Sequence, residues 1–270
     1  MKRVLTAIVA ASLAIAAILL LESDWIFWIA LALAVGCAVE YLALARRIYP
    51  GVPWWLLLAA LVAASLAWRF PAPEMPALAL VMVAAAPLLF AVVLLPSAAL
   101  AGAAVGALGW LSFGLPYLVL PVWSLYELHR ESPRLLLVLL VAVWINDSVA
   151  YWVGSTWGRR KLAPSLSPNK TWEGAVAGLA GGAAAALLGV RLWSGGTAPW
   201  WGLWGLLVVA VVAAQLGDLV ESMLKRAAAV KDSGTLLPGH GGLLDRLDAI
   251  ILAVPVFYGL LGATGLAADF

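Results

Sequence analysis

Charged residues are scarce in this sequence. Asp, Glu, Lys and Arg make up 11% of the 270 residues, whereas 65% are hydrophobic. The net charge is only +2 and the basic residues are scattered among loops, so the charge gives no argument for nucleic-acid binding. Apolar runs of about 20 residues without charge are typical of membrane-spanning helices. The composition therefore predicts an integral membrane protein with the lipid bilayer, and no nucleic acid, as its partner.

Cysteine and histidine are also nearly absent. The single Cys37 lies inside an apolar run, which excludes a disulfide framework and a cysteine-ligated metal site. His129 and His240 are the two histidines, and they fall on different loops. A zinc site, which needs clustered nitrogen or sulfur ligands, is therefore not expected.

The apolar runs predict an all-α polytopic protein, because a backbone within lipid must satisfy its own hydrogen bonds. Eight runs are regular: Val4–Leu21, Ile26–Ala45, Trp54–Trp68, Ala77–Leu95, Leu135–Gly154, Gly174–Val190, Trp201–Val220 and Leu247–Leu266. A ninth, Ser97–Leu128, contains several Gly and Pro residues and fits one span or two short ones. Counting it as one crossing gives about nine transmembrane helices.

The loops 155–172 and 222–246 each carry four basic residues, whereas Leu192–Trp200 carries no lysine or arginine. By the positive-inside rule both basic loops are cytoplasmic. We therefore expect an inner-membrane protein with a polar site between its C-terminal helices that faces the cytoplasm. We expect residues 1–134 to form an N-terminal set of helices of unclear function, and residues 135–270 to form the transmembrane half that carries this site.

Polar residues interrupt two of the C-terminal spans. Asn146 and Asp147 lie deep in one span, and Gln215 and Asp218 lie near the end of another. An aspartate at the centre of a membrane helix costs about 2.5–3.5 kcal/mol on insertion scales, so it usually faces a partner or a wet cavity. We expect a functional role for Asp147. Asp218 fits either a functional role or a simple helix end at the headgroups.

Carboxylates gather at the ends of two helices on the predicted cytoplasmic side. Asp245 and Asp248 are three residues apart and share a face, while Asp218 and Glu221 end the preceding span. Carboxylates brought together in this way repel one another unless a cation lies between them. Oxygen-only ligation suits Mg²⁺, so Asp218, Asp245 and Asp248 are the predicted metal ligands.

The loop before the last helix contains a Pro-Gly-His-Gly-Gly turn at residues 238–242. Glycines let backbone N–H groups approach an anion closely, and the helix N-terminus that follows adds positive potential. Lys225, Arg226 and Lys231 add positive charge nearby. The combination predicts a site for nucleotide phosphates and Mg²⁺.

The other basic loop ends in Ser167–Gly174, which reads SPNKTWEG. It offers a lysine, Lys170, and two hydroxyls where a helix begins. This run also fits an ordinary helix cap with Thr171 or Ser167 as the acceptor, or a lysine that meets anionic lipid.

The run Ser222–Asp248, SMLKRAAAVKDSGTLLPGHGGLLDRLD, resembles the signature of phosphatidate cytidylyltransferases at every defined position. Asp147–Gly154, Lys161–Pro164 and Ser165–Gly174 are similar to the same family. The resemblance covers the C-terminal half of the chain. The N-terminal half matches only as a generic set of spans.

The resemblance implies a CDP-diacylglycerol synthase that converts phosphatidate and CTP to CDP-diacylglycerol and pyrophosphate. It implies a Mg²⁺ requirement with room for a second cation, and a nine-span fold that forms homodimers. Two sets of site residues follow. The catalytic residues would be Asp218, Asp245, Asp248 and Lys231, and the substrate-binding residues would be Lys170, Ser167, Lys225, Arg226, His240, Gly241, Gly242 and Asp147. Asp147 would either complete the metal shell or line the cavity through which the lipid headgroup enters.

Two other functions stay open from the sequence. One is a CTP-dependent enzyme acting on another lipid phosphate, including a polyprenol-type kinase. The other is an ion-coupled transporter with Asp147 and Asp218 as its relay, although its polar residues would then be expected at the membrane midplane. A CDP-alcohol phosphotransferase is disfavoured because the chain has no D-x-x-D-G-x-x-A-R run.

Overall fold

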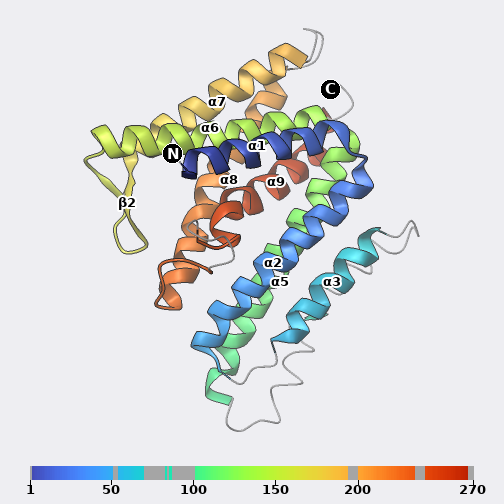
Figure 1. The fold of residues 1–270 in the computed structure, drawn as a ribbon, viewed down its shortest axis with the longest axis vertical. Coiled ribbons are helices and arrows are strands. Elements are labelled where there is room, and N and C mark those ends of the chain that lie inside the picture. Colours follow the sequence, from blue (N-terminus) through green and yellow to red (C-terminus); the bar gives the residue numbers. More distant parts are fainter. Residues whose placement is uncertain are drawn as a thin grey trace. The chain divides into compact units, whose positions relative to one another are not determined.

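The structure is a computed structural model and describes residues 2–50, 54–69, 101–193, 200–234 and 241–266, together with residues 83, 85 and 86. Its helices are α1 Lys2–Leu20, α2 Ser23–Ile48, α3 Trp55–Arg69, α5 Ala101–Glu131, α6 Pro133–Trp157, α7 Trp172–Trp193, α8 Trp200–Ala227 and α9 Leu244–Thr264 (Figure 1). Two short strands, β1 Lys161–Ala163 and β2 Ser167–Thr171, lie between α6 and α7. The fold is helical as predicted, with this one hairpin added.

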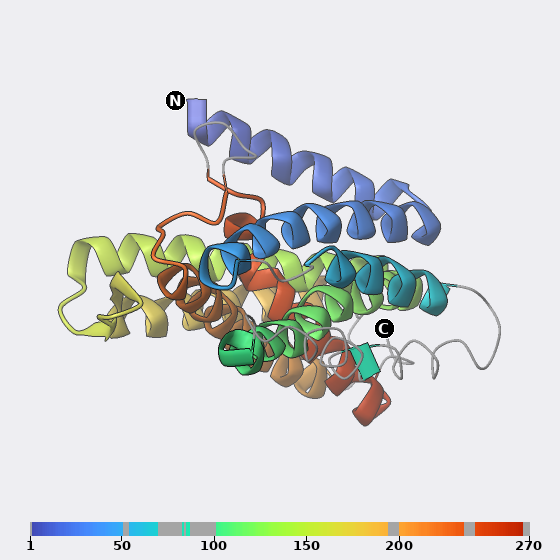
Figure 2. The same cartoon turned by 90° about the horizontal axis from the view of Figure 1, so that it is seen from below.

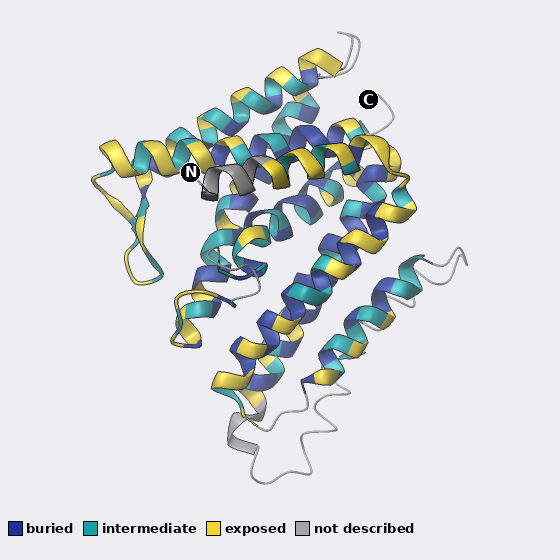
Figure 3. Cartoon of the chain, viewed as in Figure 1, coloured by how far each residue is buried: buried dark blue, intermediate teal, exposed yellow. Residues whose placement is uncertain are grey.

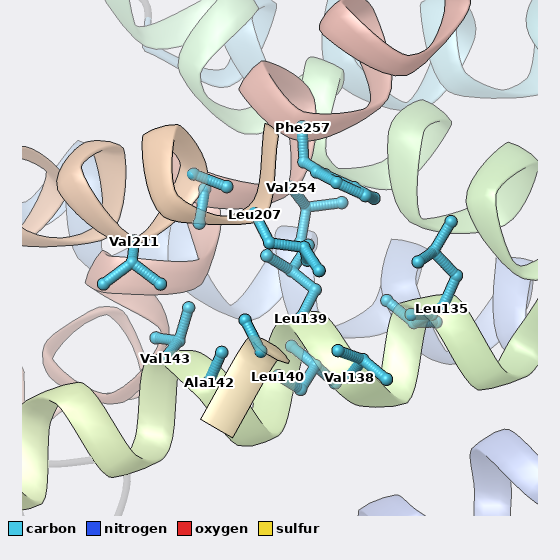
Figure 4. Close-up of a cluster of buried hydrophobic side chains, with 14 of the residues drawn as sticks. Leu135, Val138, Leu139, Leu140, Ala142, Val143, Leu207, Val211, Val254 and Phe257 are labelled. Carbon is cyan, nitrogen blue, oxygen red and sulfur yellow. The ribbon is translucent and has the colours of Figure 1, made fainter. Parts of the chain in front are cut away.

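The chain separates into two compact units. The first contains Met1–Phe27, Ser124–Met223 and Leu247–Phe270, and the second contains Trp28–Trp123 and Leu224–Arg246. In the first unit, apolar side chains from α6, α8 and α9 form one buried cluster. Leu139 of α6, Leu207 of α8 and Phe257 of α9 meet in it and are fully buried (Figure 4). This packing fixes the helices that carry the polar residues described below.

Helix α6 begins with a well-formed cap and lies against α7. Ser132 adopts an extended conformation and its hydroxyl accepts a hydrogen bond from Leu135 N at 3.2 Å, while Pro133 occupies the first turn, where no N–H is needed. Figure 2 shows α6 and α7 meeting at the hairpin. The local sequence thus places the start of α6, and its apolar faces then set its packing.

Small residues let α6 and α7 approach each other closely. Gly174, Gly178 and Gly182 are buried and spaced four residues apart on α7. A Cβ atom on Gly178 would lie 2.7 Å from Asn146 O on α6, too close for any other residue. Such a stripe of glycines is a common packing surface between membrane helices, where close van der Waals contact replaces the hydrophobic effect.

The second unit is built from α2, α3 and most of α5. The Tyr41 hydroxyl of α2 donates to Trp110 O of α5 at 2.7 Å, and Trp68 of α3 stacks on Trp123 of α5 with ring centroids 4.5 Å apart. Helix α5 is continuous over 31 residues despite Pro116 and Pro121. The ambiguous run Ser97–Leu128 therefore contributes a single long helix over its described part.

Within the described residues, six helices are long and apolar enough to cross a membrane: α2, α5, α6, α7, α8 and α9. The apolar stretch Val9–Leu20 of α1 and the 15-residue α3 are shorter, and the predicted span Ala77–Leu95 lies almost entirely outside the described residues. Large apolar side chains such as Leu13, Val105, Trp152 and Val176 are exposed, which fits contact with lipid (Figure 3). The chain is thus a helical membrane protein, and the count of nine stays a prediction.

Candidate active site

Three carboxylates meet in the first unit. Asp218 and Glu221 lie three residues apart on one face of α8, and Asp248 lies on α9. One ligand oxygen from each of the three lies within 4.8 Å of the other two. Glu221 is fully buried, whereas Asp218 and Asp248 are partly exposed. The cluster therefore has the composition and spacing of a site for a hard divalent cation.

A glycine brings these two helices together. Gly217 immediately precedes Asp218, and a Cβ atom on it would lie 2.5 Å from Asp248 O. Any larger residue at position 217 would push α8 away from the turn of α9 that carries Asp248. The spacing of the carboxylates thus depends on backbone contact between the helices as well as on the carboxylates themselves.

Lys170 balances part of this negative charge. It lies in β2, and its Nζ forms an ion pair with Asp218 Oδ2 at 2.5 Å. The predicted alternative for this region, a helix cap, is also present, because Gly174 N donates to Thr171 Oγ1 at 3.2 Å. The Glu173 carboxylate accepts from the backbone N–H groups of Arg159 and Arg160, which ties the start of the hairpin to α7. These hydrogen bonds fix the hairpin that carries Lys170 against the start of α7.

The intramembrane polar residues form a connected set. Gln215 Nε2 donates to Asn146 Oδ1 at 2.7 Å and to Ala175 O at 2.9 Å, and so links α8 to both α6 and α7. Asn146 Nδ2 donates to Asp147 Oδ1 at 2.9 Å. Asn146 is fully buried, whereas Asp147 is exposed and lies within range of the charges of Asp218 and Lys170. Asn146 and Gln215 thus have a packing role, and Asp147 belongs to the electrostatic surroundings of the cluster.

Asp245 organises the glycine-rich loop in the second unit. Its Oδ2 accepts from Ser233 N, Ser233 Oγ and Gly242 N at 2.8–2.9 Å, and its Oδ1 accepts from Lys225 Nζ at 2.7 Å. Gly241 has φ of 82°, a left-handed conformation that strongly favours glycine. The sequence places Asp245 among the metal ligands, and the contacts described here give it a second role as the anchor of this loop.

A buried carboxylate outside the motif holds the same loop. Glu40 of α2 accepts hydrogen bonds from Leu243 N, Leu244 N and the Ser233 hydroxyl at 2.8–3.0 Å. Its only signal in the sequence is that a single acidic residue interrupts the apolar run Ile26–Ala45. The sequence analysis did not single out Glu40, and it did not include Glu221 among the predicted metal ligands.

The remaining predicted residues occupy several environments. Lys231 and Arg226 are exposed, and Lys231 lines a cavity of about 480 Å³ with Arg47 of α2 and the Val230–Gly234 segment. Ser167 begins β2 and is partly exposed. Gly242 packs against Ser233 and Glu40. His240 lies outside the described residues.

A family model of the cytidylyltransferase family matches residues 1–263. The chain therefore belongs to this family, whose members generally use a divalent cation. It is 44% identical over 161 residues to a phosphatidate cytidylyltransferase of Brucella abortus, which covers 57% of each chain. It is 38% identical over 180 residues to one of Pseudomonas aeruginosa, covering 59% of this chain and 60% of that protein. The chain thus matches less than two thirds of the length of these relatives.

Proposed function

We propose that this member of the cytidylyltransferase family is a phosphatidate cytidylyltransferase, which transfers CMP from CTP to phosphatidate. The observation that carries the proposal is the Ser222–Asp248 motif, which contains Lys225, Lys231 and Asp245 and extends to Asp248 of the acidic cluster. The names of the relatives at 38% and 44% identity support the same substrates.

The chemistry requires little from a general base. A phosphate oxygen of phosphatidate attacks the α-phosphorus of CTP, the bond to the oxygen that bridges the α- and β-phosphates breaks, and pyrophosphate leaves. The attacking oxygen belongs to a phosphate monoester that is already anionic near neutral pH. Such transfers depend mainly on positioning and on neutralising charge. The residues to look for are therefore cations and metal ligands.

Asp218, Glu221 and Asp248 fit a divalent cation, because they offer only oxygen ligands and lie close enough to share one ion. We propose that this ion is Mg²⁺, which often keeps water ligands and binds substrate phosphates as well. When bound, it would neutralise charge on the phosphates of CTP and stabilise the pyrophosphate leaving group. The negative charge of Asp147 would contribute to the electrostatic potential around this ion.

Basic residues would bind the two anionic substrates. Lys225, Arg226 and Lys231 would neutralise the triphosphate. The glycine turn with His240, Gly241 and Gly242 would let the backbone approach it closely, with the Gly242 N–H held by Asp245. Lys170, with Ser167 at the start of the same strand, would receive the phosphatidate phosphate. Lys170 lies next to the start of an apolar helix, which is where a lipid headgroup arrives.

Purified protein in mixed micelles, supplied with CTP, Mg²⁺ and phosphatidate, should release pyrophosphate and form CDP-diacylglycerol. An isoprenoid phosphate is the parallel substrate. Turnover with that substrate alone would identify an enzyme for another lipid phosphate. An absence of any CTP-dependent product, with ion-driven uptake into vesicles, would favour a transporter.

Lys231→Ala and Lys170→Ala should separate the substrates. We expect Lys231→Ala to raise the KM for CTP about tenfold, because a charged hydrogen bond contributes about 1.5–3 kcal/mol. Lys170→Ala should raise the KM for phosphatidate instead, in steady-state kinetics that vary each substrate separately. Arg191→Ala, at the far end of α7, is the control. If both lysine variants alter the KM of the same substrate, the assignment of Lys170 to the lipid is wrong.

We further propose an inner-membrane location with both basic loops in the cytoplasm. In a Cys37→Ala background, cysteines placed at the exposed positions Ser165 and Asp232 should react with an impermeant reagent only from the cytoplasmic side. A cysteine at Ser194 should react only from the opposite side. Reaction of the Ser165 and Asp232 variants from opposite sides would contradict a shared cytoplasmic site.

A further inference from the structure

Glu40 lies far from the motif in sequence but is buried against it. It is 5% exposed, and 193 residues separate it from Ser233, whose hydroxyl donates to Glu40 Oε2 at 3.0 Å. A buried carboxylate is costly unless donors surround it. Glu40 has three such donors, and all three belong to the loop between α8 and α9 or to the first residue of α9.

Two of these donors are backbone N–H groups at the start of α9. Leu243 N donates to Oε1 at 2.9 Å and Leu244 N donates to Oε2 at 2.8 Å. The first N–H groups of a helix have no partner within the helix, and a negative charge there is favoured by the helix dipole. Glu40 therefore acts as an N-terminal cap supplied from another helix.

The third donor joins the two described parts of the loop. The Ser233 hydroxyl lies 3.0 Å from Glu40 Oε2 and 2.9 Å from Asp245 Oδ2. A hydroxyl has one hydrogen, so it can donate to only one of these oxygens at a time. Ser233 thus links the two carboxylates, and segment 231–234 is held beside segment 241–245.

Two glycines of the motif fit closely around Glu40. A Cβ atom on Gly234 would lie 2.5 Å from Glu40 Oε1, and one on Gly242 would meet both Glu40 Oε2 and Ser233 Oγ. A side chain at either position would therefore displace the Glu40 carboxylate from its present place. Lys231 lies three residues before Gly234 and lines the cavity that Leu44 and Arg47, one and two turns beyond Glu40 on α2, also line.

We propose that Glu40 is a positioning residue for nucleotide binding, which gives the N-terminal half of the chain a role in catalysis. The inference rests on the proposed function, in which Lys231 and the glycine turn bind the CTP phosphates. Glu40 holds both described parts of this loop in place, so that these groups are organised before CTP arrives. The hydrogen bonds described for its carboxylate all come from this loop and the start of α9, so its loss should weaken CTP binding selectively.

Glu40→Gln is the test variant. Gln keeps one carbonyl oxygen but replaces the other with an NH₂ group, which would face an N–H donor instead of accepting from it. We expect the KM and the equilibrium Kd for CTP to rise about tenfold, whereas the KM for phosphatidate stays within about twofold. Glu22→Gln, at an exposed position before α2, is the matched control.

The measurements use the full-length protein in detergent: steady-state kinetics with each substrate varied, equilibrium dialysis with labelled CTP, and thermal unfolding. Equal changes in the KM of both substrates, or a loss of kcat that only follows a lower Tm, would show a structural role and overturn the proposal. So would an unchanged Kd for CTP. Wild-type protein that neither binds nor consumes CTP would overturn the proposed function itself, which is a separate outcome.

Ser233→Ala keeps the test decisive if Glu40→Gln does not fold. The substitution removes only the hydroxyl that joins the two carboxylates. It should raise the Kd for CTP about threefold, and the double variant should be no weaker than Glu40→Gln, because the two residues act through one contact. A fully additive double variant, or an unchanged Kd in Ser233→Ala, would contradict the linkage.

Discussion

Asp218→Asn should lower kcat by about a thousandfold or more while the protein still folds and inserts. The substitution removes one negative charge from the Asp218, Glu221 and Asp248 cluster and breaks the ion pair with Lys170. A metal ion supplies several kcal/mol of transition-state stabilisation, and each 1.36 kcal/mol corresponds to about tenfold in rate. The Asn side chain has nearly the same size as that of Asp, so the packing of Gly217 against α9 should persist.

Two measurements separate this effect from misfolding. Turnover is followed as pyrophosphate release at saturating CTP and phosphatidate, and metal affinity is measured independently by titrating Mn²⁺ into the protein without substrate. We expect the affinity for Mn²⁺ to fall in parallel with turnover. Glu131→Gln, an exposed change at the end of α5, should leave both unchanged. Near-normal turnover of Asp218→Asn in excess Mg²⁺ would refute the metal assignment.

The helices of the C-terminal half were predictable because their apolar runs are long. The structure starts each of these helices before the predicted run and extends three of them beyond its end: α8, for example, continues from the predicted end at Val220 to Ala227, whereas α9 ends at Thr264. Hydropathy reports the part of a helix that suits lipid, whereas backbone hydrogen bonds continue into the polar ends. The hairpin β1–β2 was not predictable, since strands of three and five residues carry no usable alternation.

The candidate site shows the same division between local and long-range information. Asp248 was identifiable from the motif and Asp218 from its place at the end of an apolar run, and Glu221 shares a face with Asp218 through simple helical spacing. What brings α8 and α9 together is the contact of Gly217 with the backbone of Asp248, which no pattern within either helix encodes. Glu40 is the extreme case, because its partners lie about two hundred residues away. The sequence singles out Glu40 only as an acidic residue within an apolar run.

The contacts of Asp245 suggest a role that the sequence prediction did not include. As a metal ligand, Asp245 should bind the ion together with Asp218 and Asp248. In the structure its carboxylate already accepts from Lys225, Ser233 and Gly242. A carboxylate that accepts three hydrogen bonds, and shares the Ser233 hydroxyl with Glu40 as a fourth donor, has little remaining capacity for an ion. We therefore expect Asp245 to act on CTP through the loop, and Glu221 to be the third ligand.

Asp245→Asn should accordingly reduce kcat/KM for CTP about a hundredfold or more, because the NH₂ group it introduces opposes N–H donors and loosens an ion pair with Lys225. Its affinity for Mn²⁺ should stay within about threefold of the wild type, since metal binding would rest on other carboxylates. Glu221→Gln should show the opposite pattern, with weakened Mn²⁺ binding. The two variants are compared by Mn²⁺ titration and by kinetics with CTP varied at fixed phosphatidate.

The opposite result would support the ligand set predicted from the sequence. In that case Asp245→Asn would weaken Mn²⁺ binding as much as Asp218→Asn does, and Glu221→Gln would have no effect on it. The loop contacts of Asp245 would then describe the metal-free protein, with Lys225 occupying the place that the ion takes when it binds.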